Sequence, residues 1–165
     1  MGLVKAFDAS ESAILGCSDE PGFGAGPFLD RGSVIADCVG KMQAFDIRPA
    51  DPALRTALFS GGNQQKIVLA REMERDPKLL LIGQPTRGVD IGAIEFIHKR
   101  IIALRDSGKA ILLVSTELDE VLALSDRVLV MCGGRITGER RPEETDEQDM
   151  GLLMAGVGEP VEAAA

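Results

Sequence analysis

The stretch "LFSGGNQQK", residues 58–66, is the most informative part of the sequence for the fold. It predicts the start of a helix that has two adjacent glycines in its first turn. Ser60 is a residue type that caps helix N-termini well, and the apolar residues after it recur at helical spacing to about residue 75. Glycines in a first turn increase the backbone entropy lost on folding, so they make sense where something approaches the backbone closely. The stretch predicts a helix that begins after Ser60, with a close contact at its first turn.

Two interpretations of this helix start remain open on these residues alone. The first amides of a helix have no intrahelical acceptor, and the helix dipole places about half a positive charge there. With no side chains at Gly61 and Gly62, this end would suit an anion such as a phosphate. The alternative is an ordinary capped helix preceded by a tight turn.

Upstream of this stretch the sequence predicts helices and loops. Residues 9–16 resemble a short helix capped by Ser10 and ended by Gly16. Residues 31–45 predict an amphipathic helix whose apolar side chains share one face; they are Val34, Ile35, Cys38, Val39, Met42 and Phe45. The glycine-rich loop "PGFGAGP", 21–27, lacks the spacing and the preceding strand of a dinucleotide site.

Downstream, strands and helices alternate. The apolar runs 78–83, 109–115 and 127–131 predict strands, the first two of them buried, and residues 133–138 a turn with a short fourth strand. Helices are expected at 91–108, at 117–125 and at about 143–155, with Asp90 as the N-cap of the first. This alternation predicts an α/β sheet with parallel strands.

Composition excludes several classes. The net charge of −8 is the wrong sign for a non-specific nucleic-acid binder, so no nucleic-acid partner is expected. No run approaches the roughly 20 apolar residues that cross a bilayer. The three cysteines, Cys17, Cys38 and Cys132, have no metal-site spacing and are expected to be small buried hydrophobes, and no metal ligands are expected elsewhere. His98, between charged helix neighbours, is expected on a helix surface.

Four segments, in this order and spacing, resemble the nucleotide-binding domain of an ABC transporter: "FSGGNQQK" at 59–66, "LARE" at 69–72, "DPKLLLIGQPTRGVD" at 76–90 and "ILLVSTELDEV" at 111–121. The resemblance runs from about residue 28 to 155 and is strongest to the second, C-terminal cassette of tandem subunits of sugar and nucleoside importers. It implies that Ser60, Gly61, Gly62, Asn63 and Gln64 form the signature loop, which contacts the γ-phosphate of ATP held by another cassette.

The resemblance also assigns roles to residues of the α/β part. Asp90 in "GVD" would be the D-loop residue that faces the dimer partner, a role compatible with capping a helix. The Walker B acids and the switch histidine are replaced by Gly83, Gln84 and Thr116, which carry no charge and cannot hold Mg²⁺ or act as a general base. The loss of metal binding and of the general base follows from Gly83 and Gln84, and Thr116 stands in place of the switch histidine. These positions are therefore expected to be degenerate, with no catalytic residue.

The sequence contains no Walker A motif, because neither Gly40-Lys41 nor Gly108-Lys109 is followed by serine or threonine or preceded by the required glycine. The expected fold is an α/β partial P-loop NTPase of the ABC type, lacking the Walker A strand, with a helical signature subdomain. The sequence looks cut, as if it began about midway through a cassette. A gap, or a closure that the family does not show, is then expected between the strands at 109–115 and 127–131, where that family places the Walker A strand.

A single partial cassette over residues 1–165 is expected, with a helical signature part at about 9–75, a parallel α/β core at about 76–140, and a C-terminal helix and tail at about 141–165. It would contribute the signature loop to a composite site in a sugar or nucleoside importer, with ATP and Mg²⁺ held mainly by the partner cassette and none bound by this chain alone. The expected partners are another cassette, on the same or a tandem chain, and transmembrane permease subunits at the cytoplasmic face of the membrane.

The alternative is a non-catalytic regulatory or protein-binding module that kept the ABC fold. Gly83, Gln84 and Thr116 favour this alternative as much as they favour a degenerate transporter cassette. Under both hypotheses the chain belongs to an ATPase family but is not expected to hydrolyse ATP on its own.

Overall fold

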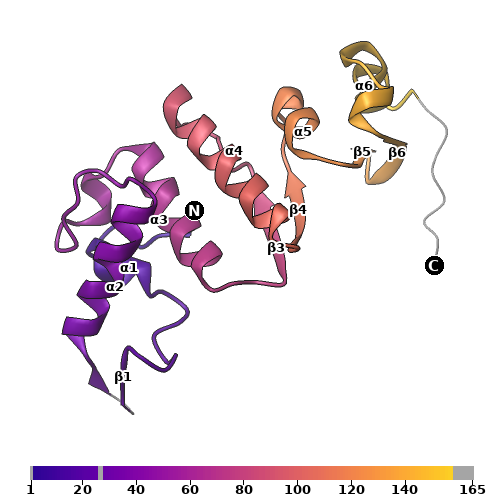
Figure 1. The fold of residues 1–165 in the computed structure, drawn as a ribbon. Coiled ribbons are helices and arrows are strands. Elements are labelled where there is room, and N and C mark those ends of the chain that lie inside the picture. The colour runs from indigo at the N-terminus through magenta and orange to yellow at the C-terminus, as the bar shows by residue number, and fades with distance from the viewer. Residues whose placement is uncertain (1, 26–27, 158–165) are drawn as a thin grey trace. The chain divides into compact units, whose positions relative to one another are not determined.

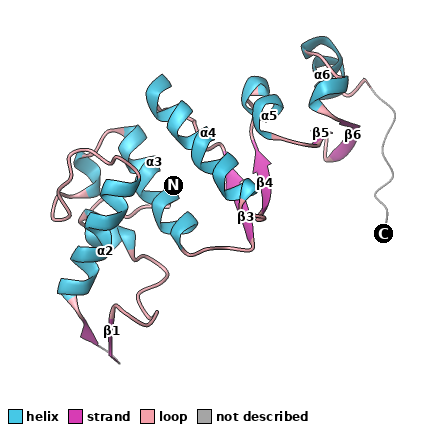
Figure 2. Cartoon of the chain, viewed as in Figure 1, coloured by secondary structure: helices cyan, strands magenta, loops and turns pink. Residues whose placement is uncertain are grey.

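The structure is a computed structural model that describes residues 2–25 and 28–157. The chain divides into two compact units, one formed by residues 1–80 and 85–111 and the other by residues 81–84 and 112–165. Figure 1 follows the chain through its elements, and Figure 2 separates helices from strands by colour.

Helices dominate the first unit (Figure 2). It contains α1 (Ala9–Ala13), α2 (Arg31–Ala44), α3 (Gly61–Glu74) and α4 (Ile91–Asp106), a 3-10 turn at Thr56–Leu58, and the short antiparallel strands β1 (Gly24–Ala25) and β2 (Phe28–Leu29). Helix α1 packs against α2 and α3, α2 packs against α3, and α3 packs against α4. The helices predicted at 31–45, after Ser60 and at 91–108 are therefore confirmed.

The predicted cap of α1 is wrong by two residues. Asp8 is the N-cap: its carboxylate accepts a hydrogen bond from the Glu11 amide at 2.8 Å, and the Glu11 carboxylate accepts one from the Asp8 amide at 3.1 Å. Ser10 lies inside the helix, where its hydroxyl donates to Asp8 at 2.7 Å. The reciprocal Asp8–Glu11 capping box satisfies two first-turn amides, and for that reason it fixes the helix start.

The buried face of α2 is narrower than its sequence predicts. Val34, Cys38 and Met42 are buried, as expected, but Ile35 and Val39 are 45% and 36% exposed. Ile35 and Val39 are four residues apart and so share a stripe beside the buried one. The apolar spacing alone could not distinguish these two neighbouring stripes.

Two cysteines belong to the core of the first unit. Cys17 and Cys38 are each 4% exposed or less, and all three cysteines are free, with Cys132 only half-buried. Burial, together with the charge of Asp37, raises the pKa of the Cys38 thiol to about 12. Burial, with a smaller contribution from Glu20, also raises the pKa of Cys17.

These raised pKa values predict selective alkylation. Thiolate is the reactive form, and at neutral pH a thiol with a raised pKa holds almost none of it. Iodoacetamide at neutral pH should therefore modify Cys132 first in the folded chain, with Cys17 and Cys38 reacting only after denaturation in urea. Peptide mass spectrometry of the native and urea-treated chain measures this order. Equal native labelling of Cys38 and Cys132 would contradict it.

Strands β3 (Leu79–Gly83) and β4 (Ala110–Val114) form a two-stranded sheet. The Ala110 amide donates to Lys78 O at 3.0 Å near one end and the Gln84 amide to Val114 O at 2.8 Å near the other, so the strands run parallel, as predicted. The predicted burial of both strands is wrong, because side chains alternate and only one face of this sheet is covered. The exposed side chains on these strands include Leu79, Leu81, Leu112 and Val114, which are 53–67% exposed.

The rest of the second unit contains α5 (Leu118–Leu124), β5 (Val128–Cys132), β6 (Arg135–Arg140), a 3-10 turn at Pro142–Glu144 and α6 (Glu147–Met154). Its core consists of Val128, Val130, Met150 and Leu153, with side chains of α5 packed against them. The helix predicted at about 143–155 thus begins later, at Glu147, after Asp146, which accepts from the Asp149 amide at 2.8 Å.

Strands β5 and β6 form an antiparallel hairpin, so the prediction of parallel strands throughout is wrong here. Gly133 and Gly134 make the turn with φ values of 57° and 77°, the left-handed pair that a tight two-residue hairpin requires. The β5–β6 sheet is separate from the β3–β4 sheet in the described residues. Strands β4 and β5 are not hydrogen-bonded to each other, which is compatible with the expected gap or with a closure that the family does not show.

No helix in the described part of the chain is both long enough and apolar enough to pass through a membrane.

Candidate functional site

The start of α3 has the geometry that its sequence predicts. Ser60 has extended backbone angles, φ −60° and ψ 159°, and its hydroxyl accepts a hydrogen bond from the Asn63 amide at 3.4 Å, which confirms Ser60 as the N-cap. Ser60 and Gly61 are exposed. The amides of the first turn have no acceptor within the helix, so this end can donate hydrogen bonds to a ligand that reaches it.

The two glycines permit a close contact within the chain itself. A methyl group at Gly61 would lie 3.0 Å from the Gly88 carbonyl, and one at Gly62 would lie 3.3 Å from the Asp90 carboxylate. Segment 88–90 therefore packs directly against the first turn of α3. The glycine pair alone does not require a phosphate, because this contact already accounts for the missing side chains.

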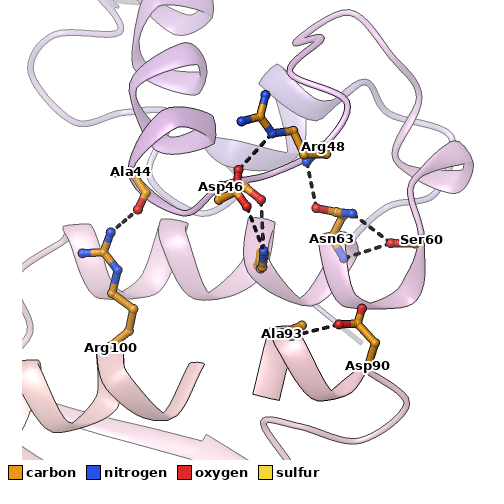
Figure 3. A network of polar contacts seen from close by, with 9 residues as sticks. Ala44, Asp46, Arg48, Ser60, Asn63, Asp90, Ala93 and Arg100 are labelled. Atoms are coloured by element: carbon orange, nitrogen blue, oxygen red, sulfur yellow. Dashed lines mark hydrogen bonds and ion pairs between the residues drawn. The ribbon is translucent and has the colours of Figure 1, made fainter. Parts of the chain in front are cut away.

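Asp90 is the N-cap of α4, as predicted, and accepts a hydrogen bond from the Ala93 amide at 2.9 Å. It is exposed and lies beside the first turn of α3 (Figure 3). Ser60, Gly61, Gly62 and Asp90, which are up to 30 positions apart in sequence, are thus brought to one place in the first unit. A partner surface could contact the two helix starts together.

The side chains of Asn63 and Gln64 turn back onto their own chain. Asn63 donates through Nδ2 to the Ser60 hydroxyl at 2.9 Å and accepts through Oδ1 from the Arg48 amide at 2.8 Å. Gln64 donates through Nε2 to the Phe59 carbonyl at 2.8 Å. In Figure 3, Asn63 lies between Arg48 and Ser60. Both side chains therefore shape the loop around Ser60.

The sequence pattern did not predict a second set of contacts, which joins the segment after α2 to α3 and α4. Asp46 follows α2 with a left-handed φ of 47°, and Lys66 of α3 donates to its carbonyl at 3.0 Å. The Lys66 ammonium lies 4.8 Å from the ring centre of Phe96, and the Arg100 guanidinium lies 4.7 Å from that of Phe45. These contacts fasten the segment after α2 to α3 and α4. The available signal was an aspartate just beyond the helix C-cap, because Asp tolerates the left-handed conformation.

In the second unit, the structure brings Gln84 and Thr116 together at the carboxyl ends of β3 and β4. The Gln84 Nε2 atom lies 3.2 Å from the Thr116 hydroxyl, and that hydroxyl lies 3.4 Å from Gln84 Oε1. Gln84 has a left-handed φ of 51°. Gly83 precedes it and is exposed. These uncharged groups bond to each other and offer neither a metal-binding carboxylate nor a base.

No group of three or more His, Cys, Asp or Glu residues that could hold a metal ion occurs among residues 2–25 and 28–157. His98 lies on α4 and is half-buried.

The chain is similar in sequence to one region of several import ATP-binding proteins. It is 45% identical over 155 residues to the nucleoside import ATP-binding protein NupA of Lactococcus lactis subsp. cremoris, which covers 94% of this chain and 31% of that protein. It is 44% identical to the guanosine import ATP-binding protein NupO of Bacillus subtilis, over 94% of this chain and 30% of that protein. The chain thus spans about a third of the length of these relatives. No protein-family model matches it.

Solved ATP-binding cassettes have the same fold. A dimeric cassette in a post-hydrolysis state bound to ADP and Pi superimposes with a TM-score of 0.69 at 18% identity, covering 85% of this chain and 59% of that one. A nucleotide-free cassette from an ABC transporter gives a TM-score of 0.67 at 20% identity, covering 92% and 60%. The predicted fold, a partial α/β cassette, is confirmed.

Proposed function

We propose that this chain, a homologue of nucleoside and sugar import ATP-binding proteins with the fold of a partial ABC cassette, contributes its signature loop to an ATP site on a partner cassette. The observation that carries the proposal is the exposed start of α3, where Ser60 and the first-turn amides lie beside Asp90 of the α4 start. The sequence similarity to import ATP-binding proteins over 94% of the chain supports it.

The residues at the start of α3 fit a phosphate group. The Ser60 hydroxyl and the first-turn amides are hydrogen-bond donors, the helix dipole favours an anion there, and both Ser60 and Gly61 are exposed. ATP bound to the Walker A loop of a partner would supply the γ-phosphate as that anion. The role of this chain is then to bind the phosphate from the second side and hold the two cassettes together.

The hydrolytic groups would have to come from the partner. Gln84 and Thr116 are uncharged and hydrogen-bond to each other, so neither position offers a carboxylate to hold Mg²⁺ or a base to activate water. In the proposed complex, ATP and Mg²⁺ are held mainly by the partner cassette. The helical region at 28–58 would carry the surface for permease subunits at the cytoplasmic face of the membrane.

ATP-dependent association tests this function. The purified chain is mixed with an intact import cassette that has a Walker A motif and whose catalytic glutamate is replaced by glutamine, so that ATP persists. Sedimentation velocity should show a complex with Mg·ATP and none with Mg·ADP or without nucleotide. Association that is equal in all three conditions would favour the regulatory or protein-binding module instead. If no complex forms with Mg·ATP, the proposal that the signature loop of this chain completes an ATP site on a partner cassette is wrong.

A further inference from the structure

Two hydrogen bonds reach the oxygen of the Ser60 hydroxyl from one residue. The Asn63 side chain donates to it through Nδ2 at 2.9 Å, and the Asn63 backbone amide donates to it at 3.4 Å. A serine hydroxyl has two acceptor lone pairs and one proton. With both lone pairs approached by donors, the hydroxyl is left to act as a donor through its proton.

The Arg48 amide fixes which way the Asn63 side chain is turned. A backbone N–H can only donate, so the Asn63 atom that faces it, at 2.8 Å, must be the carbonyl oxygen. The NH₂ group of the same side chain must then face Ser60. If the amide were flipped, its oxygen would face the Ser60 hydroxyl and would take the proton for itself.

Arg48 is itself held in place by the segment after α2. Its side chain donates to the Asp46 carboxylate at 2.9 Å (Figure 3). The Asp46 carbonyl in turn accepts from Lys66 of α3 at 3.0 Å. The segment 46–48 is therefore attached to the helix that carries Ser60 and Asn63. This attachment gives the Arg48 amide a defined position relative to Asn63.

We propose that Asn63 is a positioning residue: oriented by the Arg48 amide, it makes the Ser60 hydroxyl an obligatory hydrogen-bond donor toward the partner's phosphate. This inference rests on the proposed function, since it concerns the same phosphate site. Asn63 acts through Ser60 and not through its own contact, because both ends of its side chain are already engaged within this chain.

A double-mutant cycle in the ATP-dependent association assay tests the proposal. Ser60→Ala removes a hydrogen bond to a charged group and should weaken association with the intact cassette roughly 10- to 100-fold. Asn63→Ala should weaken it by a smaller factor, and the Ser60→Ala/Asn63→Ala double variant should be no weaker than Ser60→Ala alone. Gln43→Ala, which removes an exposed amide side chain on α2, is the control and should leave association unchanged.

Asn63→Asp keeps the acceptor for the Arg48 amide, and so keeps the segment in place, but replaces the donor that faces Ser60 with an acceptor. It should weaken association at least as much as Asn63→Ala while leaving the helical circular dichroism signal intact. Multiplicative losses in the double variant, or an Asn63→Asp variant that binds as tightly as wild type, would overturn the inference although the proposed function stands. Failure of the wild-type chain to associate in Mg·ATP would overturn both.

Discussion

Replacement of Ser60 by arginine is expected to abolish the Mg·ATP-dependent complex with an intact cassette. The change removes the N-cap hydroxyl and puts a positive charge at the positive end of α3. The long side chain also adds bulk at an exposed helix start, where a phosphate must come within hydrogen-bond distance of the amides. By analogy with the removal of one preorganised donor from an anion site, a loss of roughly 100-fold or more is expected.

Ser18→Arg is the matched control for this prediction. It introduces the same side chain and charge at an exposed serine in a turn of the first unit, two residues before Glu20, which pairs with Arg75 at the opposite end of α3. Sedimentation velocity with Mg·ATP should show a complex for Ser18→Arg and none for Ser60→Arg, while far-UV circular dichroism shows both variants folded. Equal association of the two variants would mean that the start of α3 does not meet the nucleotide.

Local sequence signals predicted the parts of the fold that local forces determine. The bounds of α2, α3 and α4 agree with the apolar spacing to within about two residues, because helix periodicity and strong N-caps act over a few neighbouring positions. Ser60 and Asp90 cap their helices as expected. A cap can be recognised from the residue type, since its side chain accepts a hydrogen bond from the amide three residues ahead.

Features that depend on distant segments were not predictable in this way. An apolar run such as 127–131 fits a buried parallel strand and a hairpin strand equally well, and only the Gly133-Gly134 pair indicated a tight turn. The exposure of Leu81 and Val114 depends on whether anything covers that face of the β3–β4 sheet, which the strand sequence does not state.

The candidate site shows the same division. The sequence indicated that something approaches Gly61 and Gly62, but it could not show that segment 88–90 of this chain does so. Asn63 was placed in the signature loop by resemblance alone. Its hydrogen bond to the Arg48 amide, 15 residues away, depends on how the chain turns after α2, and no short motif encodes that turn.

The buried Arg71 of α3 is expected to be a main support of the first unit. It is 5% exposed, and its Nη1 atom donates to the Gly2 carbonyl at 2.9 Å and to the Ser12 carbonyl at 3.1 Å, while Nη2 forms an ion pair with Glu72 at 2.7 Å. One side chain thus ties α3 to α1 and to the segment before it. If this buried donor is lost, the buried Ser12 carbonyl loses a hydrogen bond that water cannot replace.

Arg71→Met keeps most of the side-chain volume and removes these donors, so we expect it to lower the free energy of unfolding by about 3 kcal/mol, from two lost hydrogen bonds to a charged group at about 1.5 kcal/mol each. Arg75→Met, one turn further along the chain, is the control, because Arg75 is 41% exposed and its ion pair with Glu20 lies at the surface. That variant should lose less than about 1 kcal/mol. Urea denaturation followed by far-UV circular dichroism is the measurement, since the chain contains no tryptophan or tyrosine to report by fluorescence. If the two variants unfold at the same urea concentration, the buried hydrogen bonds of Arg71 are not a main support of the first unit.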